Sequence, residues 1–246
     1  MSYRITGTGS CIPDITKKNS DFLKNKFLNI DGGKFQSSNS EIIEKFNSIT
    51  GIYERRYAPD EINSSDLAAV AAGIAINDSK LDQETLDYII VAHNTGDISC
   101  SSGQVDTLPS IASKVKAKLK IKNPNCVAYD IICGCPGWVE GIIQAKSFIK
   151  SGMAKKCLVI GCDTLSRILD ENDRDSMIYA DGSGAIVLES DSSYDGGILS
   201  HKSATFTYEG ENDFIFYGSS YDTNKRTKSD QKFIKMQGRK VYEFAL

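Results

Sequence analysis

Four short apolar runs constrain the fold of this chain more than any other feature. They are YIIVA at residues 88–92, CVAYDII at 126–132, CLVIGC at 157–162 and AIVL at 185–188. Each is apolar and rich in β-branched residues without polar alternation, a pattern typical of strands covered on both faces of a parallel sheet. The sequence therefore predicts a buried sheet with helices on both sides.

Helical stretches lie between these runs. Ser65 is expected to cap the first of them, which is rich in alanine and has Asp66 in its first turn. Strands that alternate with helices indicate an α/β fold with a mostly parallel sheet. The expected helices cover residues 65–77, 108–119 and 136–152, and further strands are expected at residues 3–6 and 197–206.

Two readings of the chain as a nucleotide- or nucleic-acid-binding protein are not supported. The GTG turn after the first strand lacks the third glycine of a dinucleotide fingerprint, because Ile12 stands at that place. The formal net charge of -3 gives no general attraction to nucleic acid.

The start MSYRITGTGSCIP has no apolar signal segment, and no uncharged run is long enough to cross a bilayer. These features predict a cytoplasmic location without membrane insertion.

The seven cysteines do not predict a disulfide framework or a metal site. Their number is odd, and no secretion signal accompanies them. The closest pair is CxC, and neither His93 nor His201 stands in a ligand-like pair, which does not favour zinc. Cys126, Cys157 and Cys162 fall on expected strands, where a free cysteine is a common core residue.

The stretch YDIICGCPGWVEG, residues 129–141, places one cysteine differently from the others. Pro136 suits the first position of a helix, so Cys135 is expected at the N-cap. There the free N–H groups and the helix dipole favour a thiolate, at the carboxyl end of a parallel strand where α/β sites form. Cys133 is interpreted as a small packing residue beside it. From position alone, Cys135 is either a nucleophile or structural.

Residues 129–190 resemble the active-site region of the β-ketoacyl-acyl-carrier-protein synthase III family, which has the thiolase-like fold. The specific part is YDIICGCPGWVEGIIQAKSFIKSGMAKKCLVIGCDTLSR, followed by DRDSMIYADGSGAIVLES. Weaker matches are RITGTGSCIPD, SITGIYERRYA and MQGRKVYEFA, in the family's order. The resemblance implies a layered α/β thiolase-like fold and a homodimer.

The resemblance also implies an acyltransferase of fatty-acid or related polyketide-type biosynthesis. The family's acyl-accepting cysteine falls on Cys135, which would take an acyl group from acyl-coenzyme A and condense it with malonyl-acyl carrier protein. Backbone N–H groups, including that of Cys135, would stabilise the oxyanion. Coenzyme A thioesters and acyl carrier protein are then substrates and partners, and no bound cofactor or metal is implied.

Two features depart from the family pattern. The family uses a histidine and an asparagine far downstream of its cysteine, whereas His201 stands in HKSAT and His93 follows an expected strand. We therefore expect residues 1–190 to form a complete first thiolase-like half and residues 191–246 to begin a second, truncated one. Around SITGI the tryptophan that holds adenine in acetyl-coenzyme A users is missing, and a polar stretch at residues 95–107 lies where a gating loop is expected. The primer is therefore hypothesised to differ from acetyl-coenzyme A.

Two other readings stay open at this point, and a third is disfavoured. A 3-hydroxy-3-methylglutaryl-coenzyme A synthase-like enzyme would use Glu54 as its acid/base. A non-catalytic remnant would only dimerise or dock a carrier protein. A cysteine hydrolase is disfavoured because Cys133 stands at the position of the first glycine of the G-x-C-x-G motif, and no Asp and His follow in the order that the motif requires.

The basic tail, residues 222–240, is either a solvated loop or a docking face for an acidic carrier, with Lys225, Arg226 and Lys228 as its test residues.

Overall fold

The computed structural model describes residues 2–226 and 230–246. Contacts divide the chain into two compact units, each of which is described by itself. Unit 1 comprises Met1–Asp14, Ala58–Thr164 and Asp181–Ser203, and unit 2 comprises Ile15–Tyr57, Leu165–Ala180 and Ala204–Leu246. The expected division at residue 190 into two thiolase-like halves stays a prediction. Among the described residues, no helix has both the length and the apolar character that a bilayer crossing requires.

Unit 1 is built on a five-stranded sheet with the order β1-β9-β8-β4-β7. Strand β4 is parallel to both β7 and β8, whereas β9 is antiparallel to both β8 and β1. The α/β class is confirmed, but the sheet is mixed rather than mostly parallel. The strands are β1 (Tyr3–Cys11), β4 (Tyr88–Ala92), β7 (Val127–Ile131), β8 (Lys156–Thr164) and β9 (Asp181–Ser190), with a hairpin of β5 (Asp97–Ile98) and β6 (Val105–Asp106) beside them.

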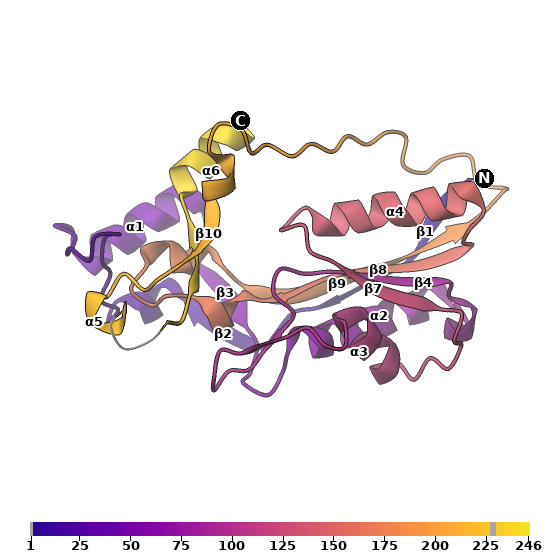
Figure 1. The fold of residues 1–246 in the computed structure, drawn as a ribbon, viewed down its shortest axis with the longest axis horizontal. Coiled ribbons are helices and arrows are strands. Elements are labelled where there is room, and N and C mark those ends of the chain that lie inside the picture. The colour runs from indigo at the N-terminus through magenta and orange to yellow at the C-terminus, as the bar shows by residue number, and fades with distance from the viewer. Residues whose placement is uncertain (1, 227–229) are drawn as a thin grey trace. The chain divides into compact units, whose positions relative to one another are not determined.

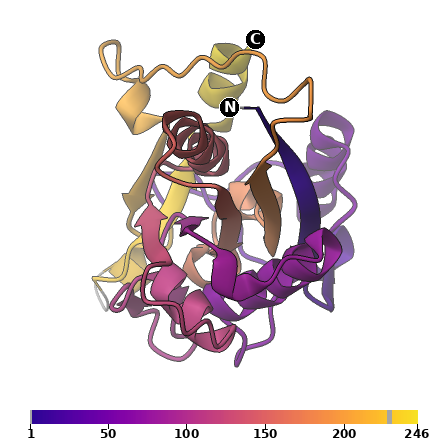
Figure 2. The ribbon, with the colours of Figure 1, turned by 90° about the vertical axis from the view of Figure 1, so that its right-hand side faces the viewer.

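Helices cover both faces of this sheet, as expected (Figures 1 and 2). Alternate residues of each central strand point to opposite faces, so Ile89 and Val91 pack with α2 and α3 while Ile90 packs with α4. Strand β7 is less buried than its sequence suggested, with Val127 47% exposed, because it lies at the edge of the sheet. The helices are α2 (Ser64–Ser79), α3 (Ile111–Lys118) and α4 (Gly137–Ser151).

The GTG sequence of β1 has a packing role. A Cβ atom on Gly7 would lie 2.1 Å from the carbonyl oxygen of Ala75, and one on Gly9 would lie 2.1 Å from that of Ala71. Helix α2 therefore lies against the backbone of β1, and only glycine fits at these two positions. Strand β1 also continues to Cys11, well past the expected end at residue 6, because it pairs with β9 along its whole length.

Helix boundaries differ from the sequence expectations at the caps. Asn63, not Ser65, is the N-cap of α2, and its backbone N–H donates to the Asp66 carboxylate at 2.9 Å. The N–H of Ser65 instead donates to Asp97 at 2.8 Å. Helix α3 begins after Ser110, whose hydroxyl accepts from the N–H of Ser113 at 3.1 Å. Asn63 and Ser65 are both suitable N-cap residues near the same helix end, and Asp97, the partner of Ser65, lies far away in sequence. Sequence alone therefore did not identify the N-cap.

The strand expected at residues 197–206 is not formed. The carbonyl oxygen of Ile198 accepts hydrogen bonds from the Tyr3 hydroxyl at 3.0 Å and from the Lys146 ammonium at 3.2 Å. These two bonds hold the segment at Ile198, and most of the segment is exposed.

Unit 2 has two small antiparallel ribbons and an aromatic core. Phe22, Phe27, Ile42 and Met177 are buried together, and the Arg55 guanidinium lies 5.0 Å from the centre of the Phe22 ring. The helix expected near residue 236 is confirmed as α6 (Gly238–Ala245). The other elements are β2 (Ile15–Lys18), β3 (Glu54–Tyr57), β10 (Ile215–Gly218), β11 (Phe233–Met236), α1 (Asn39–Thr50) and α5 (Thr223–Arg226).

Short 3₁₀ turns complete both units. They cover Asn19–Phe22, Gln83–Thr85, Leu165–Ile168, Arg174–Ile178 and Glu211–Asp213.

Candidate active site

The turn between β7 and α4 carries the cysteine that the sequence singled out. All five residues from 132 to 136 are exposed. Gly134 has φ +65°, a left-handed conformation that glycine adopts readily, and its carbonyl oxygen accepts from the N–H of Gly137 at 3.0 Å. The chain therefore reverses sharply here and presents Cys135 to solvent.

Cys135 lies directly before the start of α4. The N-cap is Pro136 and the first helical residue is Gly137, one position later than expected. The first N–H groups of a helix have no intrahelical partner, and the dipole is positive at this end. An exposed sulfur at this place suits a nucleophile that must become an anion.

Three glycines allow α4 to lie close to the strands. A Cβ atom on Gly141 would lie 2.8 Å from Cγ1 of Val159, and one on Gly137 would lie 3.2 Å from Cβ of Ala92. Gly161 of β8 leaves room for the Trp138 side chain, because a Cβ there would lie 3.3 Å from it. This close packing fixes the start of α4, and hence Cys135, against the carboxyl ends of β4 and β7.

Cys133 is exposed, which contradicts its interpretation as a packing residue. It follows the end of β7, which is an edge strand of the sheet. Its Cβ lies 3.6 Å from the place that a Cβ on Gly137 would take, so its side chain starts beside the first turn of α4. Both cysteines of the CGC sequence therefore lie at the same helix start.

The three cysteines that the sequence placed on strands are buried, as predicted. Cys126, Cys157 and Cys162 are buried, and burial raises the pKa of each thiol, to about 12 for Cys157. A buried thiol with a raised pKa is a poor nucleophile at neutral pH. These three residues belong to the core of unit 1.

Two polar pairs join the carboxyl ends of the parallel strands. The backbone and side-chain N–H groups of Asn94, after β4, donate to the Asp163 carboxylate of β8 at 2.9 and 2.7 Å. Burial raises the pKa of Asp163 in spite of these bonds. Parallel strands end at the same edge of a sheet, so this pair lies at the edge where Cys135 emerges. Sequence reasoning missed it, although the available signal was a polar residue one or two positions after each apolar run, Asp163 after residues 157–162 and Asn94 after residues 88–92.

His93 and Asp130 form a second pair, under α3. Nε2 of His93 lies 3.0 Å from Oδ2 of Asp130, and Nδ1 accepts from the N–H of Gly96 at 2.9 Å. Because Nδ1 accepts, the ring proton is on Nε2 and points at Asp130. The same carboxylate accepts from the N–H groups of Ile111 and Ala112 at 2.7 and 2.8 Å. Burial raises the pKa of Asp130, but these hydrogen bonds outweigh it and hold the pKa below its usual value.

His93 is therefore a buried core residue. It is 2% exposed and is held by Asp130 at the start of α3, on the face of the sheet opposite to α4. Ala92, its neighbour, faces the start of α4.

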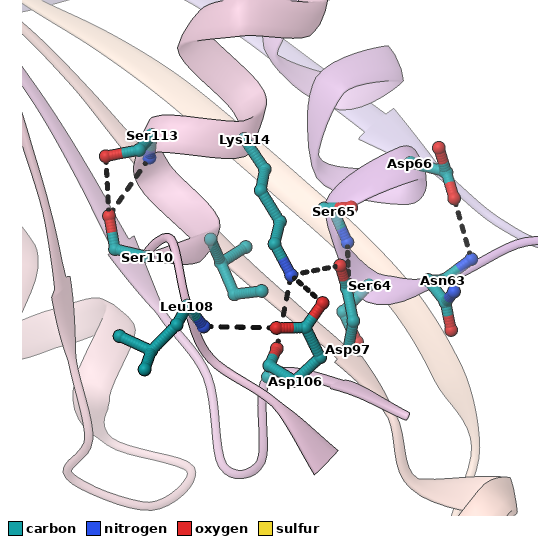
Figure 3. Close-up of polar contacts among 12 residues, drawn as sticks. Asn63, Ser64, Ser65, Asp66, Asp97, Asp106, Leu108, Ser110, Ser113 and Lys114 are labelled. Atoms are coloured by element: carbon teal, nitrogen blue, oxygen red, sulfur yellow. Dashed lines mark hydrogen bonds and ion pairs between the residues drawn. The ribbon is translucent and has the colours of Figure 1, made fainter. Parts of the chain in front are cut away.

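The polar stretch at residues 95–107 contains the β5–β6 hairpin, which one lysine fixes (Figure 3). Nζ of Lys114 lies 3.0 Å from Oδ2 of Asp97 and 2.9 Å from Oδ2 of Asp106. The other oxygen of Asp97 accepts from the N–H of Ser65 on α2. The hairpin is thus bound to both α2 and α3, and whether it gates a substrate stays a prediction. No signal in the sequence paired Lys114 with two carboxylates of the hairpin.

Several cations of the basic tail have partners within unit 2. Lys235 is buried between Asp170 and Asp173, with Nζ at 2.6 and 3.2 Å from their oxygens, so it is not available to a carrier protein. Lys225 pairs with Glu171 at 2.5 Å, and Arg226 donates to the backbone oxygens of Ser220 and Ile30. Lys228, the third test residue, lies outside the described residues.

The residues near SITGI lie on or after α1 in unit 2. Phe46 packs against the aromatic core, whereas Lys45 and Ile49 are exposed on α1. Glu54, the alternative acid/base, is on β3 and pairs with Arg56 at 3.2 Å. No group of three or more His, Cys, Asp or Glu side chains in the described parts of the chain is arranged to hold a metal ion.

Comparisons with known proteins agree with the geometry of this site. The family model for 3-oxoacyl-[acyl-carrier-protein (ACP)] synthase III matches residues 129–205, which include β7, Cys135 and α4. β-Ketoacyl-[acyl-carrier-protein] synthase III 1 of Vibrio vulnificus is 35% identical over 248 residues, covering 100% of this chain and 68% of the relative. The synthase III of Neisseria gonorrhoeae is 40% identical over 190 residues, covering 76% of this chain and 52% of the relative.

Solved structures show the same fold. The 3-oxoacyl-(acyl carrier protein) synthase III of Pseudomonas aeruginosa superposes with a TM-score of 0.75 at 26% identity, covering 99% of this chain and 67% of that one. The synthase III of Aquifex aeolicus gives a TM-score of 0.72 at 30% identity, covering 99% and 67%. The thiolase-like fold expected from the resemblance is confirmed. This chain belongs to the β-ketoacyl-acyl-carrier-protein synthase III family of condensing enzymes.

Proposed function

We propose that this chain is an acyltransferase in which Cys135 accepts an acyl group from a coenzyme A thioester. The observation that carries the proposal is the position of Cys135, exposed directly before α4 and at the carboxyl end of parallel strand β7. Among the seven cysteines, three are buried in the core and unreactive by position. Family membership supports the same assignment.

The first step is a thioester exchange. The Cys135 thiolate attacks the acyl carbonyl carbon, and the carbonyl oxygen becomes an oxyanion that backbone N–H groups at the turn can stabilise. When the tetrahedral intermediate collapses, the bond to the coenzyme A sulfur breaks. Coenzyme A leaves as a thiolate and takes up a proton, and the acyl group stays on Cys135.

The second step would form a carbon–carbon bond. Malonyl-acyl carrier protein loses carbon dioxide, and the resulting carbanion attacks the Cys135 thioester. The product is a β-ketoacyl thioester on the carrier protein, and the Cys135 thiol is free again. Splitting the reaction at the acyl-enzyme replaces one difficult step by two easier ones. The relatives carry acyl carrier protein in their names, which supports this partner.

The remaining sequence expectations are part of this proposal. Membership of the family supports a place in fatty-acid biosynthesis, a homodimer and a cytoplasmic location. Carrier docking would use Lys240, which is exposed on α6, together with Arg239, which is exposed and pairs with Glu243 at 2.7 Å; Lys235 is buried and therefore cannot take part. The departures around SITGI and the Lys114-bound hairpin support a primer other than acetyl-coenzyme A.

The test is acyl transfer from a panel of coenzyme A thioesters to the protein. The panel runs from acetyl through medium-chain to branched acyl groups, and intact mass spectrometry detects each adduct. We expect one adduct, mapped to Cys135, in the parent chain and in Cys100→Ser, which removes another exposed thiol. We expect none in Cys135→Ser.

The same assay separates the alternatives. An adduct on Cys135 that malonyl-acyl carrier protein converts to product supports the synthase. An adduct that acetoacetyl-coenzyme A consumes instead would indicate the 3-hydroxy-3-methylglutaryl-coenzyme A synthase-like reaction. No adduct from any donor, with carrier protein still bound, would indicate the non-catalytic docking module. Product that forms with acetyl-coenzyme A far faster than with other donors would overturn the primer hypothesis.

A further inference from the structure

The other cysteine of the CGC turn, Cys133, has no role in the proposed acyl-transfer reaction. Cys133 is exposed, as is Cys135, and Gly134 between them has φ +65°. Every residue from 132 to 136 is exposed, so solvent reaches both thiols. In the described part of the chain no other pair of exposed cysteines is this close in sequence.

Both cysteines lie beside the start of α4. The side chain of Cys133 starts 3.6 Å from the position of a Cβ on Gly137, and Cys135 directly precedes the same helix start. Cα atoms two residues apart are separated by at most about 7 Å and by less in a turn. Disulfides join Cα atoms about 4.4–6.8 Å apart, a range that residues two positions apart can reach in a turn, and glycine at position 134 permits a wide range of backbone conformations there.

We propose that Cys133 and Cys135 form a reversible disulfide that blocks acyl transfer under oxidising conditions. The inference rests on the proposed function for its consequence, because Cys135 in a disulfide cannot accept an acyl group. Its chemistry rests only on the two exposed thiols. By forming the disulfide, Cys133 prevents the irreversible oxidation of Cys135. The turn is then a redox-sensitive regulatory site.

The oxidant is a peroxide. The Cys135 thiolate attacks one peroxide oxygen, the O–O bond breaks, and the hydroxide released takes up a proton to give water; Cys135 becomes a sulfenic acid. The Cys133 thiolate then attacks the Cys135 sulfur, the S–O bond breaks, and a second hydroxide leaves and is protonated. The two thiols are oxidised, and the peroxide is reduced to two waters. A dithiol reductant restores both thiols by exchange.

The remaining cysteines do not offer the same pairing. Cys126 is the nearest in sequence but is 1% exposed. Cys100 is exposed, and its thiol donates to the carboxylate of Asp60 at 3.1 Å. Cys100→Ser is therefore a matched control that removes an exposed thiol outside the turn.

The experiment treats the reduced protein, at low concentration, with hydrogen peroxide and then maps its peptides. Cleavage after lysine releases residues 123–146, which contain Cys126, Cys133 and Cys135. We expect this peptide to lose two hydrogens, to resist fragmentation between residues 133 and 135, and to recover with a dithiol. Cys100→Ser should behave like the parent chain.

Two variants make the outcome decisive. In Cys133→Ser the disulfide should be absent, and Cys135 should instead gain oxygen atoms, with acyl acceptance lost irreversibly. In Cys135→Ser the disulfide should also be absent. Oxygen addition at Cys135 of the parent chain, equal to that in Cys133→Ser, would overturn the inference. Because this readout is a mass change without any acyl donor, a failure of the inference is distinguishable from a failure of the proposed function.

Discussion

Nε2 of His93 lies 3.0 Å from Oδ2 of Asp130, and this one carboxylate joins the end of β4 to the start of α3. The pair orders the edge of the sheet where Cys135 emerges, although neither side chain is assigned a step in the reaction. A carboxylate that accepts from His93 and from two backbone N–H groups leaves all three donors unsatisfied when it is removed.

We expect Asp130→Ala to lower the free energy of unfolding by about 2–4 kcal/mol. Asp82→Ala is the matched control, because among the described residues the carboxylate of the exposed Asp82 accepts only from the N–H of Glu84. Its cost should stay below about 1 kcal/mol. Urea denaturation of both variants provides the comparison, and equal costs would show that the Asp130 hydrogen bonds contribute little.

Asp130 also predicts a pH dependence of stability. Its pKa in the folded protein lies below the ordinary value, so the unfolded chain binds more protons as the pH falls. The stabilisation is present above the unfolded-state pKa of about 4 and is lost as the pH falls through the folded-state pKa. Denaturation at several pH values should show a steeper loss of stability below about pH 4 for the parent chain than for Asp130→Asn. Parallel curves for the two proteins would contradict this assignment.

The close contact of β1 and α2 predicts opposite effects for two glycine substitutions. Gly9→Ala would place its Cβ 2.1 Å from the carbonyl oxygen of Ala71, and neither backbone can move away without disrupting the sheet. We expect it to destabilise unit 1 by about 3 kcal/mol or more. Gly73→Ala on α2 meets only Cδ2 of Leu119, at 3.8 Å, and should stabilise by about 0.5–1 kcal/mol. Thermal unfolding tests the pair, and a stable Gly9→Ala protein would refute the packing described for β1.

The ion pairs of Lys114 should restrict local opening of the hairpin at residues 95–107. In Lys114→Met the carboxylates of Asp97 and Asp106 lose their shared cation, and we expect faster amide hydrogen exchange in residues 97–106. Lys118→Met, which breaks only the more exposed pair with Asp66, serves as the control. If the hairpin also governs primer access, Lys114→Met should change the relative rates with different acyl donors. Exchange that is unchanged relative to Lys118→Met would remove Lys114 as the residue that fixes the hairpin.

Replacing the buried Lys235 should strongly destabilise unit 2. Lys235→Met leaves Asp170 and Asp173 buried without their cation, for which we expect a loss of about 3–5 kcal/mol. Lys225→Met breaks an exposed pair with Glu171 and should cost at most about 1 kcal/mol. Chemical denaturation of both variants tests this difference. A small cost for Lys235→Met would mean that the two carboxylates take up protons or water instead.

The sequence predicted the parts of the fold that depend on local pattern. The bounds of β4 were correct, and the buried cysteines and the start of α4 near Pro136 were correct within a residue. These features follow from apolar runs, glycine and proline, which act over a few residues. The same local reasoning placed Cys135 at the end of a parallel strand.

Features set by contacts between distant residues were not predictable. The antiparallel pairing of β9 depends on how the chain returns, which no local pattern encodes. The pairs His93–Asp130 and Lys114–Asp97 join residues 37 and 17 positions apart. Cys133 follows an edge strand, β7, and where no strand forms at residues 197–206 the carbonyl oxygen of Ile198 accepts from side chains of β1 and α4.

The most direct test of the central claim is the mass of the reduced protein after incubation with acyl-coenzyme A donors, with the adduct located by peptide mapping. We expect an acyl thioester on Cys135 in the parent chain and in Cys100→Ser, and none in Cys135→Ser. An acyl group found on another residue, or a parent chain that stays unmodified with every donor, would contradict the assignment of Cys135 as the acyl acceptor.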